Sequence, residues 1–424
     1  MAGKYVIDER TLNSIATAIR EKEESTEPIA VTEFSERISN IKTSEELDEE
    51  LNTYEEEVDE QEVTLETITE LLKVKGGVVP AKYAPRFLSF YKYPGTELDY
   101  ELANIDGSNI TDMSYSFSNC SNLTSLDLTS LNTENVTNMD HLLYSCSNLT
   151  SLDLTGLNTE NVTNMTYMFA QCKVLPKLDL SDLKTSNVTN MSFMFGYCNE
   201  LTDLNVASLD TSNVTTFSNT FISNFILPTL DISDWDVRKV TTFSQMFFSC
   251  RALKELDLSK WETDSLTGAG LTSMFSGCQS IEKIDISNFK SNSLTSVTEV
   301  FNNCAKLKEL NLSNVEFSGM TSINKLFYNC SSLEYLDLSG FDTSSVTTAT
   351  QVFYGCSNLT TLVINSPRVF KITNSNSFTS SGISNGKCTV YVPDDLVTQY
   401  KGSTYWANYA SRIKGISELP VEEA

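Results

Sequence analysis

The chain has 424 residues, of which 30 are Lys or Arg and 56 are Asp or Glu, so its net charge at pH 7 is −26. This excess of negative charge argues against nucleic acid and anionic membrane surfaces as partners, because both repel an acidic protein. No stretch approaches the ~18 apolar residues of a membrane-spanning helix. The polar start lacks the apolar run of a secretory signal. We therefore expect a protein made in the cytoplasm, without membrane insertion.

Residues 1–44 contain two short amphipathic helical patterns joined by a proline-containing link. The first places Leu12, Ile15 and Ile19 on one face, and the second places Phe34 on its apolar face. The stretch TLNSIATAIREK…EPIAVTEFSERI resembles the helical module at the start of many phage tail, baseplate and fibre proteins. This resemblance implies an all-α module that anchors the chain to other virion structural proteins.

Residues 45–76 carry a heptad pattern with apolar residues spaced alternately by four and three positions. Thirteen acidic residues and no basic residue lie between Lys42 and Lys73, so flanking charges repel between identical parallel helices. The pattern predicts an acidic coiled coil that makes the protein a homo-oligomer, with a trimer favoured. The alternative is an amphipathic helix docked on the chain's own solenoid. The predicted core positions are Leu47, Leu51, Tyr54, Val58, Gln61, Leu65, Ile68 and Leu72.

Two adjacent glycines, Gly76 and Gly77, predict the end of this helix, because glycine is a poor helix former. The aromatic-rich segment that follows belongs to residues 77–109. We expect this segment to cover the first rung of the next domain as an N-terminal cap.

Residues 110–370 repeat with a period of about 26. Nine cysteines between residues 110 and 356 mark the period. One unit has Asn224 in place of the cysteine, and one unit carries a two-residue insertion near Gly268. Each unit contains a Leu-x-Leu centre, as at Leu126 and Leu128, whose alternation predicts a strand with one buried face. Segments 139–143 and 165–169 are expected to form a short helix on the opposite side. The repeat predicts an α/β leucine-rich repeat solenoid with parallel strands and short helices.

The runs NVTNM, which starts at Asn135, and CSSLEYLDL, which starts at Cys330, resemble the BspA-like leucine-rich repeat family. This family occurs on bacterial and protist surface adhesins and in bacteriophage structural proteins. Residues 371–424 are similar to the helical C-terminal cap that often closes such arrays. A cap is also needed physically, because the last rung would otherwise expose its apolar core.

The cysteine slot is interpreted as a buried column of free thiols. Metal sites need clustered cysteine pairs and nearby histidines, and His141 is the only histidine of the chain. Asn224 replaces cysteine in one unit, which does not fit a disulfide ladder. We expect no metal site and no cofactor, and we expect His141 to be a solvated helix residue.

The residue between the two leucines forms a second column, which alternation points outward onto the concave face. Two interpretations remain open: a strip that binds a cation or another ligand, and a consensus position satisfied by neighbouring Ser and Thr hydroxyls. Adjacent carboxylates are expected to raise one another's pKa. Catalysis by such a pair, as in retaining glycosidases, is not favoured, because a uniform ladder makes no pair different. The candidate ligand-binding residues are Asp127, Asp153, Asp179, Asp231, Asp257, Asp285, Asp337 and Tyr335.

Together these features predict a bacteriophage structural appendage, of the tail-fibre, baseplate or head-fibre type. The solenoid is expected to recognise a host-surface glycan or protein, and we expect no enzyme and no catalytic residue. The protein would then be located in the virion after assembly in the host cytoplasm. The alternative is a BspA-like bacterial surface adhesin that binds host or bacterial ligands.

Overall fold

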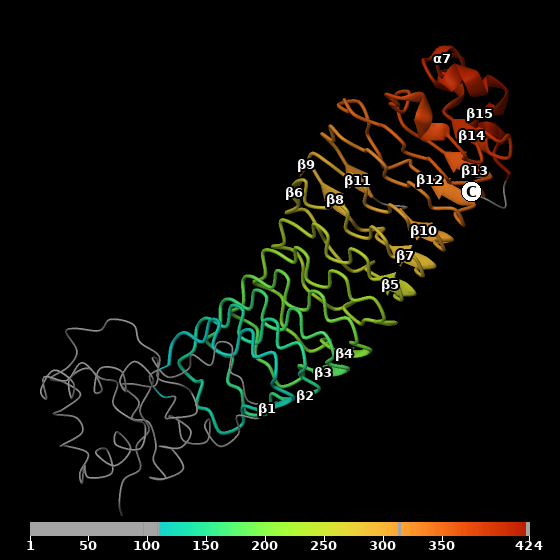
Figure 1. The fold of residues 1–424 in the computed structure, drawn as a ribbon. Helices are drawn as coiled ribbons and strands as arrows, with labels where there is room; N and C mark the ends of the chain where they lie inside the picture. The colour runs from blue at the N-terminus through green and yellow to red at the C-terminus, as the bar shows by residue number, and fades with distance from the viewer. Residues whose placement is uncertain (1–95, 97–107, 109, 313–314, 421–424) are drawn as a thin grey trace, which may run out of the picture.

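The structure is a computed structural model that describes residues 96, 108, 110–312 and 315–420. The predicted helical module (1–44), the coiled coil (45–76) and all but two residues of the predicted N-terminal cap (77–109) lie outside this part of the chain. The described residues form an elongated solenoid whose successive turns stack along one axis (Figure 1).

Short parallel strands line one long side of the solenoid, and we call them the strand row (Figure 1). Most of these strands bury their central apolar residue, as where Leu178 is buried between exposed Lys177 and Asp179, whereas Leu152 and Leu310 are partly buried. Neighbouring strands pair with a 26-residue offset, such as Ser125 with Ser151. The predicted leucine-rich-repeat-like solenoid of parallel strands is therefore confirmed. The strand row comprises β1 (Ser125–Asp127), β2 (Ser151–Asp153), β3 (Lys177–Asp179), β4 (Asp203–Asn205), β5 (Glu255–Asp257), β7 (Lys283–Asp285), β10 (Glu309–Asn311) and β12 (Tyr335–Asp337).

Prolines interrupt the strand row at two points. Within a regular pair the residue before the strand donates across the rungs, as from the Thr150 N–H to the Thr124 carbonyl over 2.9 Å. Pro176 and Pro228 occupy this position and have no N–H to donate. The row divides into β1-β2, β3-β4, β5-β7-β10 and β12, which pairs with β13 instead of β10, and two of its three breaks lie at these two prolines.

The opposite side of the solenoid consists of successive turns, so the short helices expected in segments 139–143 and 165–169 are wrong. The main chain here bonds between rungs, as where the His141 N–H donates to the Thr166 carbonyl over 2.8 Å. His141 has a φ of +55°, which turns its N–H toward the next rung. An α-helix needs these donors for bonds to the fourth residue before. Stacking between rungs therefore excludes helix in these segments.

The interior contains stacked columns of identical side chains. Phe221, Phe247 and Phe275 are fully buried, and their ring centroids lie 5.5 and 5.6 Å apart with nearly parallel planes. Leucines from the strand row pack against the same core. Each rung thus buries its apolar face on two neighbours, as a solenoid requires.

Four shorter strands pair on another side of the C-terminal half. They are β6 (Thr267–Gly268), β8 (Lys290–Ser291), β9 (Ser293–Leu294) and β11 (Glu316–Phe317), paired as β6-β9 and β8-β11.

The C-terminal end continues the last sheet and closes the core. Strands β13 (Thr361–Val363), β14 (Thr389–Val392) and β15 (Ile413–Gly415) join β12 in one parallel sheet. The Trp406 indole N–H donates to the Phe370 carbonyl over 2.9 Å, and the Phe370 N–H donates to the Tyr400 hydroxyl over 2.8 Å. The helices of this end are η2 (Ser375–Phe378), η3 (Asp394–Leu396), α7 (Val397–Gly402), η4 (Trp406–Arg412) and η5 (Ile416–Glu418).

Candidate functional site

The strand row carries an open depression of about 870 Å³ between β3 and β7. Outward side chains of successive rungs form its floor and sides, and its centre is the rung between β4 and β5. The size is that of a ligand site rather than of a single-ion site. The lining residues are Lys177, Asp179, 202–205, 229–233, 255–257, Lys283 and Asp285.

The central rung, residues 228–233, does not form a strand, and we call it the broken rung. The main-chain N–H and C=O groups of Thr229, Leu230 and Asp231 make no hydrogen bond in the described structure. Pro228 removes the donor that starts each regular rung. In the broken rung and the rung after it, a tryptophan also stands at the buried repeat position that is leucine or phenylalanine in other rungs. The Trp261 indole N–H donates to the Ile232 carbonyl over 3.1 Å. The break leaves unpaired polar main chain at the floor of the depression.

The aspartates of the strand row are held by the turn that follows each strand. Asp179 accepts the Ser181 main-chain N–H over 3.0 Å, and Asp257 accepts that of Ser259 over 3.0 Å. The Ser181 N–H and hydroxyl lower the pKa of Asp179, and the Ser259 hydroxyl and N–H lower that of Asp257. Thr155, through its hydroxyl and N–H, does the same to Asp153. The expected mutual raising of pKa values is therefore wrong for these three groups.

The structure brings together only part of the predicted ligand-binding set. Asp179, Asp231, Asp257 and Asp285 line the depression. The other predicted residues lie outside it: Asp127 and Asp153 on β1 and β2, and Tyr335 and Asp337 on β12.

Asp203 and Asn205, which were not among the candidate ligand-binding residues predicted from the sequence, also line the depression. Asn205 donates from its amide to Asp179 over 2.9 Å, so an amide replaces a carboxylate at this rung. The sequence-based predictions also did not include the broken rung. The available signal was a proline two residues before the Leu-x-Leu centre, because a regular rung needs an N–H there.

The lining of the depression is acidic. It contains six carboxylates and two ammonium groups, a net charge of −4. Lys177 is 3.0 Å from Asp203, and Lys283 is 3.4 Å from Glu309, so both cations are already paired. Among the described residues, no three His, Cys, Asp or Glu side chains are grouped so that they could hold a metal ion.

The cysteine column is buried and free of disulfides, as predicted. Its thiols donate to the preceding rung, as from Cys250 Sγ to the Phe221 carbonyl over 3.0 Å. Asn224 takes the same role, with its amide 2.9 Å from the Phe195 carbonyl. Burial raises the pKa of Cys250 to about 12, so this thiol stays protonated and unreactive.

His141 is not a solvated helix residue, which corrects the prediction. Its ring lies between those of Tyr115 and Tyr167, with centroids 4.5 and 4.4 Å away, and it is half-buried. Its Nδ1 is 2.8 Å from Asp140 Oδ1. The rung repeat stacks these rings because each occupies the same outward position, and Phe193 continues the stack at 4.3 Å from Tyr167.

The parallel strands, the 26-residue register and the buried leucines define a leucine-rich-repeat-like β-solenoid of about 11 turns with few helices. The chain belongs to the family described as "Mycoplasma protein of unknown function, DUF285", whose model matches residues 89–201, 176–272 and 269–382. A search of curated proteins found no match. In the described part of the chain, no helix has the length and apolarity needed to cross a bilayer.

Two solved structures are similar at low sequence identity. One is the crystal structure of a TLR13–ssRNA13 complex, with 16% sequence identity and a TM-score of 0.31. The match covers 80% of this chain and 53% of the matched chain. The functional domain of InlJ from Listeria monocytogenes, which includes a cysteine ladder, is 17% identical. This match covers 68% of this chain and 66% of the InlJ chain, with a TM-score of 0.22. The chain thus spans about half of the first protein and less than two thirds of the second.

Proposed function

We propose that this protein is a structural appendage of a bacteriophage particle that uses its solenoid to recognise the host surface. The observation that supports recognition best is the 870 Å³ depression in the strand row, a site of ligand size in an otherwise regular array. Residues 1–44 would anchor the chain to other virion proteins, and residues 45–76 would join three copies. Both assignments rest on the sequence patterns described above.

A binding role fits the carboxylates of this site better than a catalytic one. A glycosidase pair needs one carboxylic acid whose pKa is raised so that it can donate a proton. The turn hydroxyls and N–H groups instead lower the pKa values of Asp179 and Asp257, which hold both groups ionised near neutral pH. Ionised carboxylates can accept hydrogen bonds and ion pairs from a ligand without any chemical step.

The thiol column supports assembly inside a reducing cell. All ten cysteines are free and buried, which suits a protein folded in a host cytoplasm before particle release. The BspA-like resemblance also supports the second candidate, a bacterial surface adhesin, since that family includes such proteins.

Mass spectrometry and immunogold labelling of purified particles test the proposal. We expect the full chain in virions at a constant copy number, and we expect a chain lacking residues 1–44 to be left out of them. Absence from particles, together with labelling of the bacterial surface, would refute the appendage and favour the adhesin.

A further inference from the structure

We propose that an aromatic patch on the turn side of residues 112–198 binds the same patch of a second copy of this chain. This inference rests on the homo-oligomer proposed above and names the surface through which its solenoids meet. We call the patch the aromatic ladder, and it consists of the rings of Tyr115, His141, Tyr144, Tyr167, Phe193 and Tyr197.

The aromatic ladder is open to solvent where the fold does not need rings. Tyr115 is 47% exposed and Tyr197 is 37% exposed, and the other rings of the ladder are half-buried. In later rungs the slot of Tyr115 holds Asn219, Gln245 and Ser273. Polar residues therefore satisfy this slot, and the stacking of rungs does not explain why four successive rungs place rings there. Exposed apolar clusters of this kind mark interaction surfaces.

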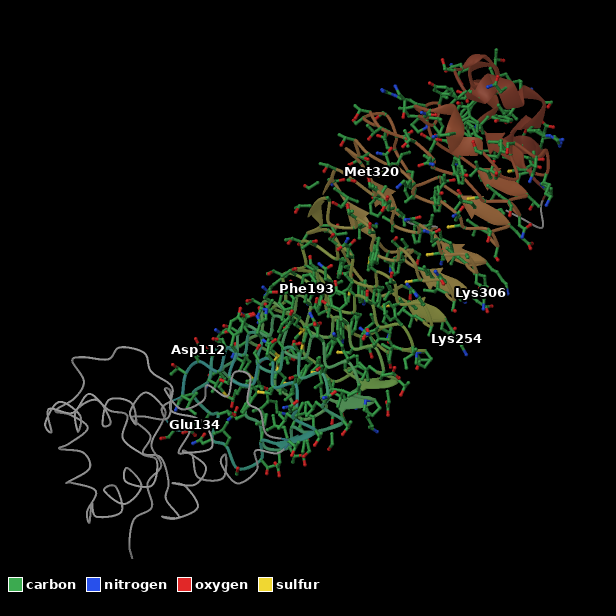
Figure 2. The ribbon with its side chains drawn as sticks, viewed as in Figure 1. Asp112, Glu134, Phe193, Lys254, Lys306 and Met320 are labelled. Atoms are coloured by element: carbon green, nitrogen blue, oxygen red, sulfur yellow. The ribbon has the colours of Figure 1, made fainter. Side chains whose placement is uncertain are left out.

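Charge favours a second copy as the partner. The chain has a net charge of −26, so two copies repel each other over much of their surface. Figure 2 shows Phe193 on the opposite side of the solenoid from Lys254 and Lys306. On the turn side Asp112 and Asp140 are the only acidic residues, and Lys and Arg are absent, in the segments 112–120, 138–146, 164–172 and 190–198. Two copies can therefore meet through the aromatic ladder with little repulsion.

Ring orientation favours a partner with aromatic side chains of its own. The centroids of Tyr115, His141, Tyr167 and Phe193 lie 4.5, 4.4 and 4.3 Å apart with nearly parallel planes, so the rings cover one another's faces and turn their edges outward. A sugar ring that stacks on aromatic faces finds few free faces here. Ring edges instead pack on the faces of other rings. Tyr197 stacks on no ring in the described part of the chain, so its faces can take the ring edges of a second copy.

The position of the aromatic ladder along the chain also fits a contact between copies. Its first ring, Tyr115, lies in the first repeat after the predicted coiled coil (45–76) and N-terminal cap (77–109). A coiled coil that joins copies raises the effective concentration of the segments next to it, so a weak contact there is enough. Tyr197 of one copy against Phe193 of the next is a head-to-tail contact, which closes into a ring of three.

Photo-cross-linking of the full-length protein tests the contact directly. We expect Tyr197→p-benzoylphenylalanine to give a covalent dimer on irradiation, with the cross-linked peptide in residues 138–172 or 190–198 of the second copy. The matched control is Tyr335→p-benzoylphenylalanine on β12, where the parent tyrosine is 36% exposed on the strand row. This control should give no dimer.

Mass photometry over a dilution series tests what the contact contributes. Tyr115→Ser/Tyr197→Ser should raise the concentration at which the oligomer half-dissociates at least tenfold. Tyr328→Ser/Tyr354→Ser removes two stacked tyrosines from the turn side of later rungs and should change it less than twofold. Serine already stands at the equivalent slots of other rungs, so both variants keep the fold: Ser273 and Ser249 for the first pair, and Ser118 and Ser276 for the control.

Several results would overturn the inference. They are a monomer at every concentration, cross-linking from position 335 as strong as from position 197, and equal effects of the two serine pairs. A cross-link from position 197 to residues 45–76 of the same chain would show that the chain itself covers the aromatic ladder. An oligomer that is unchanged in Tyr115→Ser/Tyr197→Ser would leave the coiled coil standing without this contact. Detection of the protein in virions is independent of these results, so the appendage proposal stands or fails separately.

Discussion

Replacing Gly340 by alanine should destabilise the solenoid strongly, because two rungs approach each other very closely at this point. A Cβ at Gly340 would overlap the carbonyl oxygen of Val315 and lie 2.9 Å from its carbonyl carbon. The obstructing atoms belong to the main chain, so no side chain can rotate away. The two rungs must separate instead.

The cost follows from what this separation disturbs. Forced overpacking of a close-packed interior costs about 1–3 kcal/mol and occasionally more. Moving the rungs apart also lengthens the bond from the Phe317 N–H to the Gly340 carbonyl, already 3.4 Å, which adds about 1 kcal/mol. We therefore expect Gly340→Ala to lower the free energy of unfolding by about 3 kcal/mol.

Gly402→Ala provides a matched control. Gly402 is the last residue of α7, and an added Cβ there meets no atom within 4 Å. Alanine is the better helix former, so this variant should be unchanged or up to about 1 kcal/mol more stable. Urea unfolding, followed by the fluorescence of buried Trp261 and Trp406, measures both midpoints. If the two variants unfold at the same urea concentration, the close approach of the rungs is not as described.

Three further predictions use the same unfolding assay or a thiol titration. Phe247→Ala removes a ring stacked between two others and should lower the free energy of unfolding by about 3–5 kcal/mol. Phe247→Leu should lower it less, and losses below about 1 kcal/mol in both variants would contradict the stacked core. Because its folded-state pKa is lowered, Asp257 contributes stability above its unfolded pKa of about 3.9, and this contribution disappears as pH falls through the lower folded value. Asp257→Asn should therefore show a shallower loss of stability below about pH 4 than the parent, and identical acid profiles would disprove the assigned bonds. Because Cys250 and the other cysteines are buried, the native protein should not react with a thiol reagent at pH 8, whereas all ten cysteines should react after unfolding. Fast labelling of the native protein would show that the cysteine column is open to solvent.

The sequence by itself predicted the parts of this fold that repeat. The spacing of Cys120, Cys146 and their equivalents predicted the register, and the Leu-x-Leu alternation predicted strands with one buried face. Both were confirmed, because a solenoid places each repeat position directly above its equivalent. Burial of an identical side chain in every rung is a local signal repeated along the chain, and a single sequence is enough to show it.

Only the tertiary structure decided how the rungs bond to one another. The segment around His141 has a helical pattern of apolar residues, yet its N–H groups serve the next rung, and its ring stacks between two tyrosines. Likewise, the aspartate column looks uniform in sequence, but the break at Pro228 groups four of its members in one depression and leaves three outside. Hydrogen bonds between rungs join residues about 25 positions apart, and their competition with local helix and strand geometry cannot be read from the pattern of one unit.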